Sequence, residues 1–371
     1  MLNNNTQAFF ALVRAGLWEQ ECPLLPYGAI DFKEVYRLAR EQSLVGVVAA
    51  GLEHVMDVKV PKTDVLQFVG DTLQLEQRNL GMNKFLGELV EKMCAEGIHT
   101  LLVKGQGIAQ CYGRPLWRTC GDVDLFLDAQ NYEKAKKYLL PIANSIEPEG
   151  EYKKHLGMSI DSWVVELHGN LRCGLSNKMD RTIDIIQDDV FIGGNVRSWM
   201  NGRTQVSLPG VDCDILFVFT HFIKHFYTGG LGLRQICDWC RLLWTYREEI
   251  DANLLNNRLN QLGLLTEWKA FGAFAVYYLG MPLDAVPFYE GKSSWKRKAD
   301  KICTFILEVG NFGHNRDMSY MSQKPYLLRK VKSFGLRIAD VSRHAKVFPM
   351  DSLRFFPAIV LNGLRSAANG E

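Results

Sequence analysis

Two carboxylates stand two residues apart in the stretch Gly121-Asp-Val-Asp-Leu-Phe-Leu127. The apolar residues that surround Asp122 and Asp124 predict a short buried strand. Because successive side chains of a strand point to opposite faces, residues at i and i+2 share one face. Two buried carboxylates on one face are costly unless a cation neutralises them. The spacing therefore favours a divalent-cation site over a solvated sheet face.

A third carboxylate, Glu166, is the best candidate for completing this site. Mg²⁺ prefers octahedral oxygen coordination and usually takes carboxylates together with substrate phosphates. Glu166 lies on a predicted strand, Trp163 to Leu167, that forms a hairpin with the strand Tyr152 to Ile160 across Asp161-Ser162. This hairpin is expected to bring Glu166 next to the aspartate pair. An acidic residue on a solvated sheet edge is the alternative interpretation of Glu166.

A glycine turn precedes the aspartate strand. Thr100 to Val103 predicts a buried strand, and Lys104-Gly-Gln-Gly107 then turns the chain into a short helical segment. Lys104 is predicted either to bind phosphate as a point charge or to form an ion pair with the neighbouring carboxylates. Arg118 is similarly predicted to clamp a phosphate or to fix its loop through a salt bridge.

The order of these features resembles the nucleotidyltransferase superfamily that includes DNA polymerase β and kanamycin nucleotidyltransferase. Within it, the chain is most similar to the bacterial group of uncharacterised nucleotidyltransferases, over most of its length beyond about residue 35. The features that carry the resemblance are Lys104-Gly105, Tyr112-Gly113, Arg118, Gly121-Asp-Val-Asp-Leu125, Glu166-Leu-His168, His221, His225, Leu233-Arg234, Asp238 and the turn Gly310-Asn-Phe-Gly313.

The resemblance implies a palm-like sheet in which Asp122, Asp124 and Glu166 are catalytic and hold two Mg²⁺ ions, with Mn²⁺ as the alternative, around a nucleoside triphosphate such as ATP. It also implies a set of nucleotide-binding residues, which comprises Lys104, Gly105, Gln106, Arg118 and Gly121. Many superfamily members have Gly-Ser at the turn. This chain has Lys104-Gly105-Gln106 there, so the serine hydroxyl that contacts phosphate is missing.

The implied reaction moves a nucleoside monophosphate from the triphosphate to a hydroxyl of an acceptor. By the same resemblance, Glu166 lies beside the acceptor metal and takes the acceptor proton. One alternative is a regulatory module that binds nucleotide or metal with incomplete catalytic geometry. The other is an RNA-modifying nucleotidyltransferase or toxin-like protein that uses the residues from Lys324 onward, where nine Lys or Arg stand against three acidic residues. A solvated helical face is the favoured explanation of that charge.

Further polar residues are candidates for contacting the acceptor or orienting the carboxylates, namely His168, His225, Arg234 and Asp238. His168 shares the strand face of Glu166, where an orienting role and an ordinary structural hydrogen bond are equally supported. His221 and His225 have the i, i+4 spacing of a Zn²⁺ site, but a third ligand is not evident nearby, so we favour a link between the helical region and the cleft. Arg234 and Asp238 have the same spacing and are predicted to pair or to face the acceptor pocket.

Two short patterns near these residues are interpreted as structural. Cys237 and Cys240 match C-x-x-C but lie inside a predicted helix without a second cysteine pair, which favours packing over redox or zinc chemistry. Gly229-Gly-Leu-Gly232 follows a helix and not a strand, so it is predicted to be a turn between helices and not a phosphate loop.

Helices are expected on both sides of this sheet. On the N-terminal side, Thr6 is predicted to cap one helix, and Asp31 a second that continues through Leu44 and Val47. A long amphipathic helix from Asp64 to Glu96 then ends at Gly97. Beyond the aspartate strand the expected elements are helices at 130–140, 212–227, 233–247, 252–280, 295–310 and 324–345, and a strand pair at 196–208.

Length and composition agree with an α+β protein in which helical regions flank a small mixed sheet. With 371 residues and 47% apolar residues the chain can bury a full core. We expect an N-terminal helical region at 1–62, a nucleotidyltransferase-like α/β domain at 63–210 and a C-terminal helical domain at 211–371. The net charge of +2 indicates neither an overall nucleic-acid surface nor a membrane surface.

Nine cysteines without a disulfide or zinc pattern, and a start that lacks a signal-peptide pattern, predict a cytoplasmic protein. The apolar stretches are too short for a membrane-spanning helix, so no membrane partner is expected.

Overall fold

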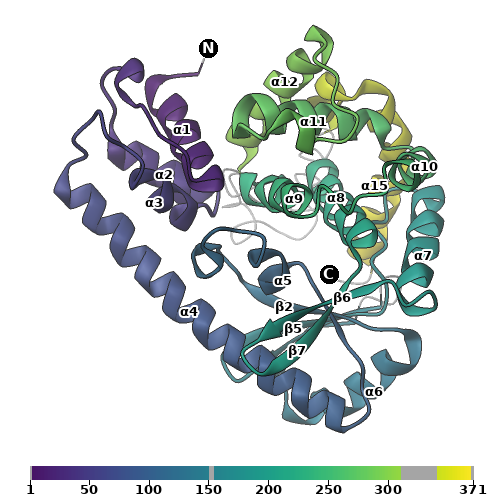
Figure 1. Cartoon of the computed structure of the whole chain (residues 1–371). Coiled ribbons are helices and arrows are strands. Elements are labelled where there is room, and N and C mark those ends of the chain that lie inside the picture. Colours follow the sequence, from purple (N-terminus) through teal and green to yellow (C-terminus); the bar gives the residue numbers. More distant parts are fainter. Residues whose placement is uncertain (1, 150–153, 311–340, 369–371) are drawn as a thin grey trace.

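A mixed five-stranded sheet forms the centre of the computed structural model, which describes residues 2–149, 154–310 and 341–368 (Figure 1). The strand order is β1-β2-β5-β4-β3, and only β2 and β5 pair in parallel. The strands are β1 (Leu101–Val103), β2 (Asp122–Phe126), β3 (Ser145–Ile146), β4 (His155–Ile160) and β5 (Trp163–His168). The predicted α+β architecture is therefore confirmed.

The two faces of this sheet differ in character. Val123, Leu125, Val165 and Leu167 are buried on one face, in a core that also contains residues of α4 (Lys62–Ala95), α6 (Ala129–Leu139) and the ribbon β6 (Val196–Asn201) and β7 (Thr204–Pro209). Because side chains alternate along a strand, the acidic residues and His168 lie on the opposite face. The sheet thus presents its polar face away from that core.

Helix α4 connects the N-terminal helices to the sheet (Figure 1). It begins and ends close to the predicted residues, and Gly97 follows it with a φ of 65°. The apolar stripe predicted along α4 is buried at Phe68 and Leu86 but exposed at Leu73, because the middle of this 34-residue helix lies between the two regions that it joins.

The N-terminal helices differ from prediction in two details. Helix α1 (Asn4–Trp18) is capped by Asn3, which accepts a hydrogen bond from the Thr6 N–H at 2.8 Å, so the prediction of Thr6 as the cap was wrong. Asp31 does cap α2 (Phe32–Glu41), but the helix does not continue through Val47. Ser43 has a φ of 55°, which interrupts the helical conformation, and a separate helix, α3 (Val45–Leu52), follows.

A layer of helices lies on the polar side of the sheet, led by α8 (Val211–Thr228) and α9 (Leu233–Thr245) (Figure 1). The segment predicted to be helical at 252–280 contains two helices, α10 (Ala252–Leu262) and α11 (Leu265–Leu279), because Gly263 adopts a φ of 69° between them. The remaining elements are α5 (Gly105–Ala109), α7 (Asn177–Phe191), α10 (Ala252–Leu262), α11 (Leu265–Leu279), α12 (Ser293–Val309), α15 (Pro349–Ala368) and the 3₁₀ turns η1 (Leu25–Tyr27), η2 (Pro115–Trp117), η3 (Leu140–Ile142) and η4 (Leu283–Ala285).

Some predicted features lie wholly or partly outside the described residues. They are the start of the first hairpin strand at Tyr152, the turn Gly310–Gly313, the helix at 324–345 and the basic stretch from Lys324. Among the helices that are described, none combines the length and the apolarity that crossing a bilayer requires.

Candidate metal and nucleotide site

A cavity of about 450 Å³ lies between the polar face of the sheet and helices α8 and α9. We call its two sides the strand wall and the helix wall. The strand wall comprises Lys104, Asp122, Asp124, His155, Glu166 and His168. The helix wall comprises Phe217, His221, His225, Arg234, Gln235 and Asp238. This volume is in the usual range for a small-molecule site.

The parallel pairing of β2 with β5 brings three carboxylates together on the strand wall. Asp124 stands directly opposite Glu166 in the register, and Asp122 lies one side-chain repeat before Asp124. One carboxylate oxygen from each of Asp122, Asp124 and Glu166 lies within 4.8 Å of the others. The predicted position of Glu166 beside the aspartate pair is therefore confirmed, whereas its catalytic role stays a prediction.

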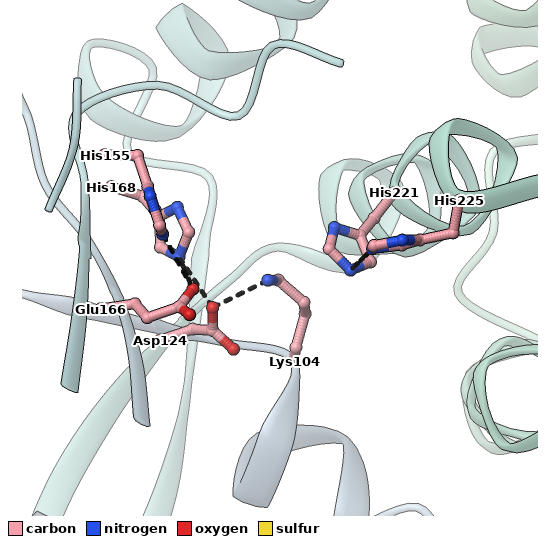
Figure 2. A network of polar contacts seen from close by, with 7 residues as sticks. All are labelled: Lys104, Asp124, His155, Glu166, His168, His221 and His225. Carbon is pink, nitrogen blue, oxygen red and sulfur yellow. Dashed lines mark hydrogen bonds and ion pairs between the residues drawn. The ribbon is translucent and has the colours of Figure 1, made fainter. Parts of the chain in front are cut away.

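Asp124 is the most buried of the three carboxylates, and it has two cationic neighbours. Its Oδ1 accepts hydrogen bonds from Lys104 Nζ at 2.7 Å and from His168 Nε2 at 2.7 Å (Figure 2). Burial alone would raise the pKa of Asp124, but Lys104 and His168 outweigh it and hold that pKa below its ordinary value. Asp124 is thus kept ionised although its side chain is only 2% exposed.

Glu166 is held by two imidazoles. His155 Nε2 lies 3.0 Å and His168 Nε2 3.4 Å from Glu166 Oε2. Burial acts to raise the pKa of Glu166, yet the hydrogen bonds with these two histidines lower it far below its ordinary value. Burial acts to lower the pKa of His168, but its hydrogen bonds with Asp124 and Glu166 outweigh burial and raise that pKa. A carboxylate with such a low pKa is a good cation ligand and a poor proton acceptor.

Asp122 differs from the other two carboxylates because no described residue donates a hydrogen bond to it. Burial, followed by repulsion from Asp124 and Glu166, raises the pKa of Asp122. A bound divalent cation would relieve this repulsion. The three oxygens therefore fit the donor set that Mg²⁺ prefers.

Lys104 occupies an unusual backbone conformation at the entrance to α5. Its φ of 57° and ψ of −145° fall in a region that is almost restricted to glycine. This conformation points the Lys104 side chain into the cavity, where Nζ reaches Asp124 (Figure 2). Burial would lower the pKa of Lys104, but the charge of Asp124 outweighs it and raises that pKa. The ion pair, one of the two predicted roles, is present in the structure.

The other residues of the predicted phosphate turn are placed differently. Gly105 lines the cavity next to Lys104. The Gln106 side chain is 1% exposed and donates to Asn79 Oδ1 at 3.1 Å, so it packs against α4 and does not face the cavity. Gly121 is exposed, and its carbonyl accepts a hydrogen bond from Arg78. Of the predicted nucleotide-binding residues, Lys104, Gly105 and Arg118 therefore line the cavity, whereas Gln106 and Gly121 do not.

The charged residues of the helix wall hold the loop before β2. Asp238 accepts hydrogen bonds from Arg118 Nε at 3.0 Å and Nη2 at 2.6 Å, and from the Tyr112 hydroxyl at 2.8 Å. Arg234 Nη1 donates to the Thr119 carbonyl at 2.7 Å. Arg234 and Asp238 do not pair with each other, but both line the cavity, which is the other arrangement predicted for them. Asp238 pairs with Arg118, which is the loop-fixing role foreseen for Arg118.

His221 and His225 form a second imidazole pair, across the cavity from Lys104 (Figure 2). Their Nε2 atoms lie 3.1 Å apart. Burial, followed by the charge of Lys104, holds the pKa of His221 well below its ordinary value. Among the residues described, the groups that could hold a cation include neither histidine. Both side chains do line the cavity, as predicted.

The two patterns interpreted as structural are confirmed as such. Cys237 and Cys240 are fully buried free thiols in α9, and burial raises the pKa of both. The glycines between residues 229 and 232 form the connection from α8 to α9.

His155 is the site residue that the sequence analysis missed. It lies opposite His168 in the β4–β5 hairpin, and the two ring centroids are 4.9 Å apart. The signal was present, because a two-residue turn at Asp161-Ser162 pairs His155 with His168 once the hairpin is extended residue by residue. The described part of β4 begins at His155 itself.

Comparison with known proteins gave one family. A family model described as an uncharacterised nucleotidyltransferase matches residues 28–280, more than half of the chain, and this range includes both walls of the cavity. Neither the curated proteins nor the solved structures contain a match to the chain.

Proposed function

Because the chain belongs to the uncharacterised nucleotidyltransferase family, we propose that it transfers a nucleoside monophosphate from a nucleoside triphosphate to a hydroxyl group, with the help of a divalent cation. The observation that carries this proposal is the convergence of Asp122, Asp124 and Glu166 on one side of a ligand-sized cavity.

These three carboxylates would hold Mg²⁺, with Mn²⁺ as the alternative ion. When bound, such an ion stabilises negative charge on the triphosphate and lowers the pKa of an acceptor hydroxyl. The carboxylates are suited to this because Lys104 and His168 hold the pKa of Asp124 low, and hydrogen bonds with His155 and His168 hold the pKa of Glu166 low. The low pKa of Glu166 supports a ligand role more strongly than the role of proton acceptor.

In the proposed reaction, the acceptor oxygen forms a bond to the α-phosphorus, and the bond from that phosphorus to the oxygen shared with the β-phosphate breaks. Pyrophosphate leaves with the bonding electrons, and the acceptor proton passes to a base. Lys104 could stabilise the negative charge of the leaving pyrophosphate, because its Nζ lies in the cavity beside the Asp124 carboxylate. We propose that Nζ moves from Asp124 to the phosphates when a triphosphate enters.

Asp122→Asn is the sharpest test of this proposal. The substitution removes one cation ligand without breaking a hydrogen bond of the described protein, whereas Asp124→Asn would also disturb Lys104 and His168. The assay supplies each α-labelled nucleoside triphosphate with Mg²⁺ and follows pyrophosphate release or label transfer. We expect the rate of Asp122→Asn to be lower than that of the wild type by on the order of 10³-fold.

The matched control is Asp161→Asn, an exposed carboxylate in the turn of the β4–β5 hairpin of the same sheet. It should retain the wild-type rate. Equal rates in the wild type and Asp122→Asn would contradict the proposed role of the carboxylates, because loss of a cation ligand cannot leave a cation-dependent rate unchanged.

The Lys104–Asp124 contact also favours a second candidate, a regulatory module that binds nucleotide without turnover. Lys104 occupies an oxygen that a cation would need, and the chain lacks the serine of the usual turn. Calorimetry with each triphosphate and Mg²⁺ separates the candidates. Binding with no pyrophosphate release across a broad set of hydroxyl acceptors would favour the module.

A further inference from the structure

We propose that His155, Glu166 and His168 form a second cation position, which takes a divalent transition ion of the Zn²⁺ class. It lies beside the carboxylate position of Asp122, Asp124 and Glu166, and the two positions share Glu166. This inference goes beyond nucleotidyl transfer, because it concerns binding of a metal ion without nucleotide.

The spacing of the donor atoms supports this position. His155 Nε2 and His168 Nε2 lie 3.0 and 3.4 Å from Glu166 Oε2, and ligand atoms of all three residues lie within 4.8 Å of one another. An ion bound at about 2.0–2.2 Å to each ligand separates neighbouring ligand atoms by about 3.0–3.6 Å. The distances from Glu166 Oε2 to the two histidine nitrogens fall in that range.

The backbone holds these donors on rigid elements. His155 and His168 are direct partners in the antiparallel β4–β5 pair, and Glu166 lies two residues before His168 on the same strand face. Figure 2 shows the two imidazole rings side by side with their nitrogens directed toward Glu166. A site on paired strands is more precisely arranged than a site on loops.

The chemistry of the two positions differs. Asp122, Asp124 and Glu166 offer oxygen atoms only, which suit Mg²⁺ and Mn²⁺. Two imidazoles with one carboxylate suit Zn²⁺, Co²⁺, Ni²⁺ or Fe²⁺ better. Glu166 would therefore link two cations of different preference. An ion can reach the second position from the cavity, which His155, Glu166 and His168 all line.

A purely hydrogen-bonded network is the competing explanation. His168 Nε2 lies 2.7 Å from Asp124 Oδ1 and His155 bonds Glu166, so both histidines have partners without a metal. The two explanations differ in what His155→Gln does. Glutamine retains a hydrogen-bond donor for Glu166 but removes the imidazole ligand.

The test is calorimetric titration of tag-free protein with Zn²⁺ alone, without nucleotide. We expect the wild type to bind Zn²⁺ at least tenfold more tightly than His155→Ala and His155→Gln, since loss of a ligand should cost at least as much as loss of an outer-shell partner, which is about 10- to 100-fold. Asp122→Asn should bind Zn²⁺ within threefold of the wild type. His99→Ala, an exposed histidine outside the cavity, is the control for surface binding.

A spectroscopic measurement gives a second readout. Co²⁺ in the wild type should develop the visible absorption of a low-coordinate nitrogen and oxygen site, and His155→Gln should lose it. Equal Zn²⁺ affinity in the wild type and His155→Gln would overturn the proposal, as would an equally large loss in Asp122→Asn. Because no nucleotide is present, either result leaves Mg²⁺-dependent nucleotidyl transfer to be judged separately.

Discussion

The two walls of the cavity use charged residues in opposite ways. On the strand wall, the charged side chains line the cavity and contact one another. Lys104 and His168 bond Asp124, and His155 bonds Glu166. On the helix wall, Arg234 and Asp238 contact the loop before β2 instead. Charged residues thus gather at the proposed ligand site on one side and hold the backbone in place on the other.

Buried carboxylates show this difference most clearly. Burial would raise the pKa of both Asp124 and Glu166, but Lys104 and His168 lower that of Asp124, and hydrogen bonds with two histidines lower that of Glu166. Glu267 of α11 lies behind the helix wall, where it is fully buried and accepts a hydrogen bond from the Tyr227 hydroxyl of α8 at 2.9 Å. Burial, followed by the charge of Asp351, raises the pKa of Glu267 to about 8. Burial therefore favours the neutral form of Glu267 inside the packed helices, whereas Asp124 and Glu166 at the proposed cation site have lowered pKa values.

The largest expected effect on folding is on the helix wall. Asp238→Ala leaves the buried Arg118 guanidinium without its carboxylate and the Tyr112 hydroxyl without its acceptor. Breaking a buried ion pair in this way costs about 3–5 kcal/mol. Urea unfolding should show this loss in the free energy of unfolding.

The double variant Arg118→Leu/Asp238→Leu sharpens that measurement, because it removes both charges and so leaves no buried charge without a partner. We expect it to lose less stability than the sum of the two single substitutions. The pair would not be structural if Asp238→Ala lost little free energy of unfolding and the loss in the double variant equalled the sum of the two single losses.

A slightly smaller, pH-dependent effect is expected at Glu267. Below pH 4.5 the carboxyl is protonated in both folded and unfolded chains, so it imposes no penalty. Between pH 4.5 and about 8 it ionises only in the unfolded chain, which lowers the stability of the fold as pH rises. Glu267→Gln keeps an acceptor for Tyr227 and removes this penalty, so the variant should be about 3 kcal/mol more stable than the wild type at pH 7.

The measurement is urea unfolding of both proteins at pH 5, 6, 7 and 8. The advantage of the variant should be small at pH 5 and grow toward pH 8. A constant difference across this range would show that Glu267 is ionised in the folded protein, and the contrast between the walls would then be lost.

The smallest effect concerns the backbone of the strand wall. Lys104 has a conformation that suits glycine, so Lys104→Gly should be more stable than Lys104→Ala by about 1 kcal/mol, although both lose the ion pair with Asp124. Urea unfolding of the two variants isolates this strain. If Lys104 binds phosphate, both variants should bind ATP with Mg²⁺ equally weakly.

Alanine and glycine variants of equal stability would indicate that the conformation is not strained. Full ATP affinity in both variants would instead assign Lys104 to the ion pair alone.

Much of the candidate site follows from short-range patterns. The i, i+2 spacing of Asp122 and Asp124 puts them on one strand face, and the two-residue turn before Trp163 sets the register that carries Glu166 and His168. The cap of α2 at Asp31 was equally local. The first helix cap was missed because Asn3 and Thr6 are both good capping residues, and their spacing does not decide between them.

By itself, the sequence determined which side chains share a strand face and where most helices begin and end, because those properties depend on neighbours a few residues apart. Only the tertiary structure decided the partner of each charge. Arg118 and Asp238 are 120 residues apart, and Lys104 reaches Asp124 across two antiparallel strands. The energy of an ion pair depends on the distance between the charges and on their burial. Asp238 therefore pairs with the distant Arg118 and not with Arg234, although Arg234 is only four residues away in the sequence.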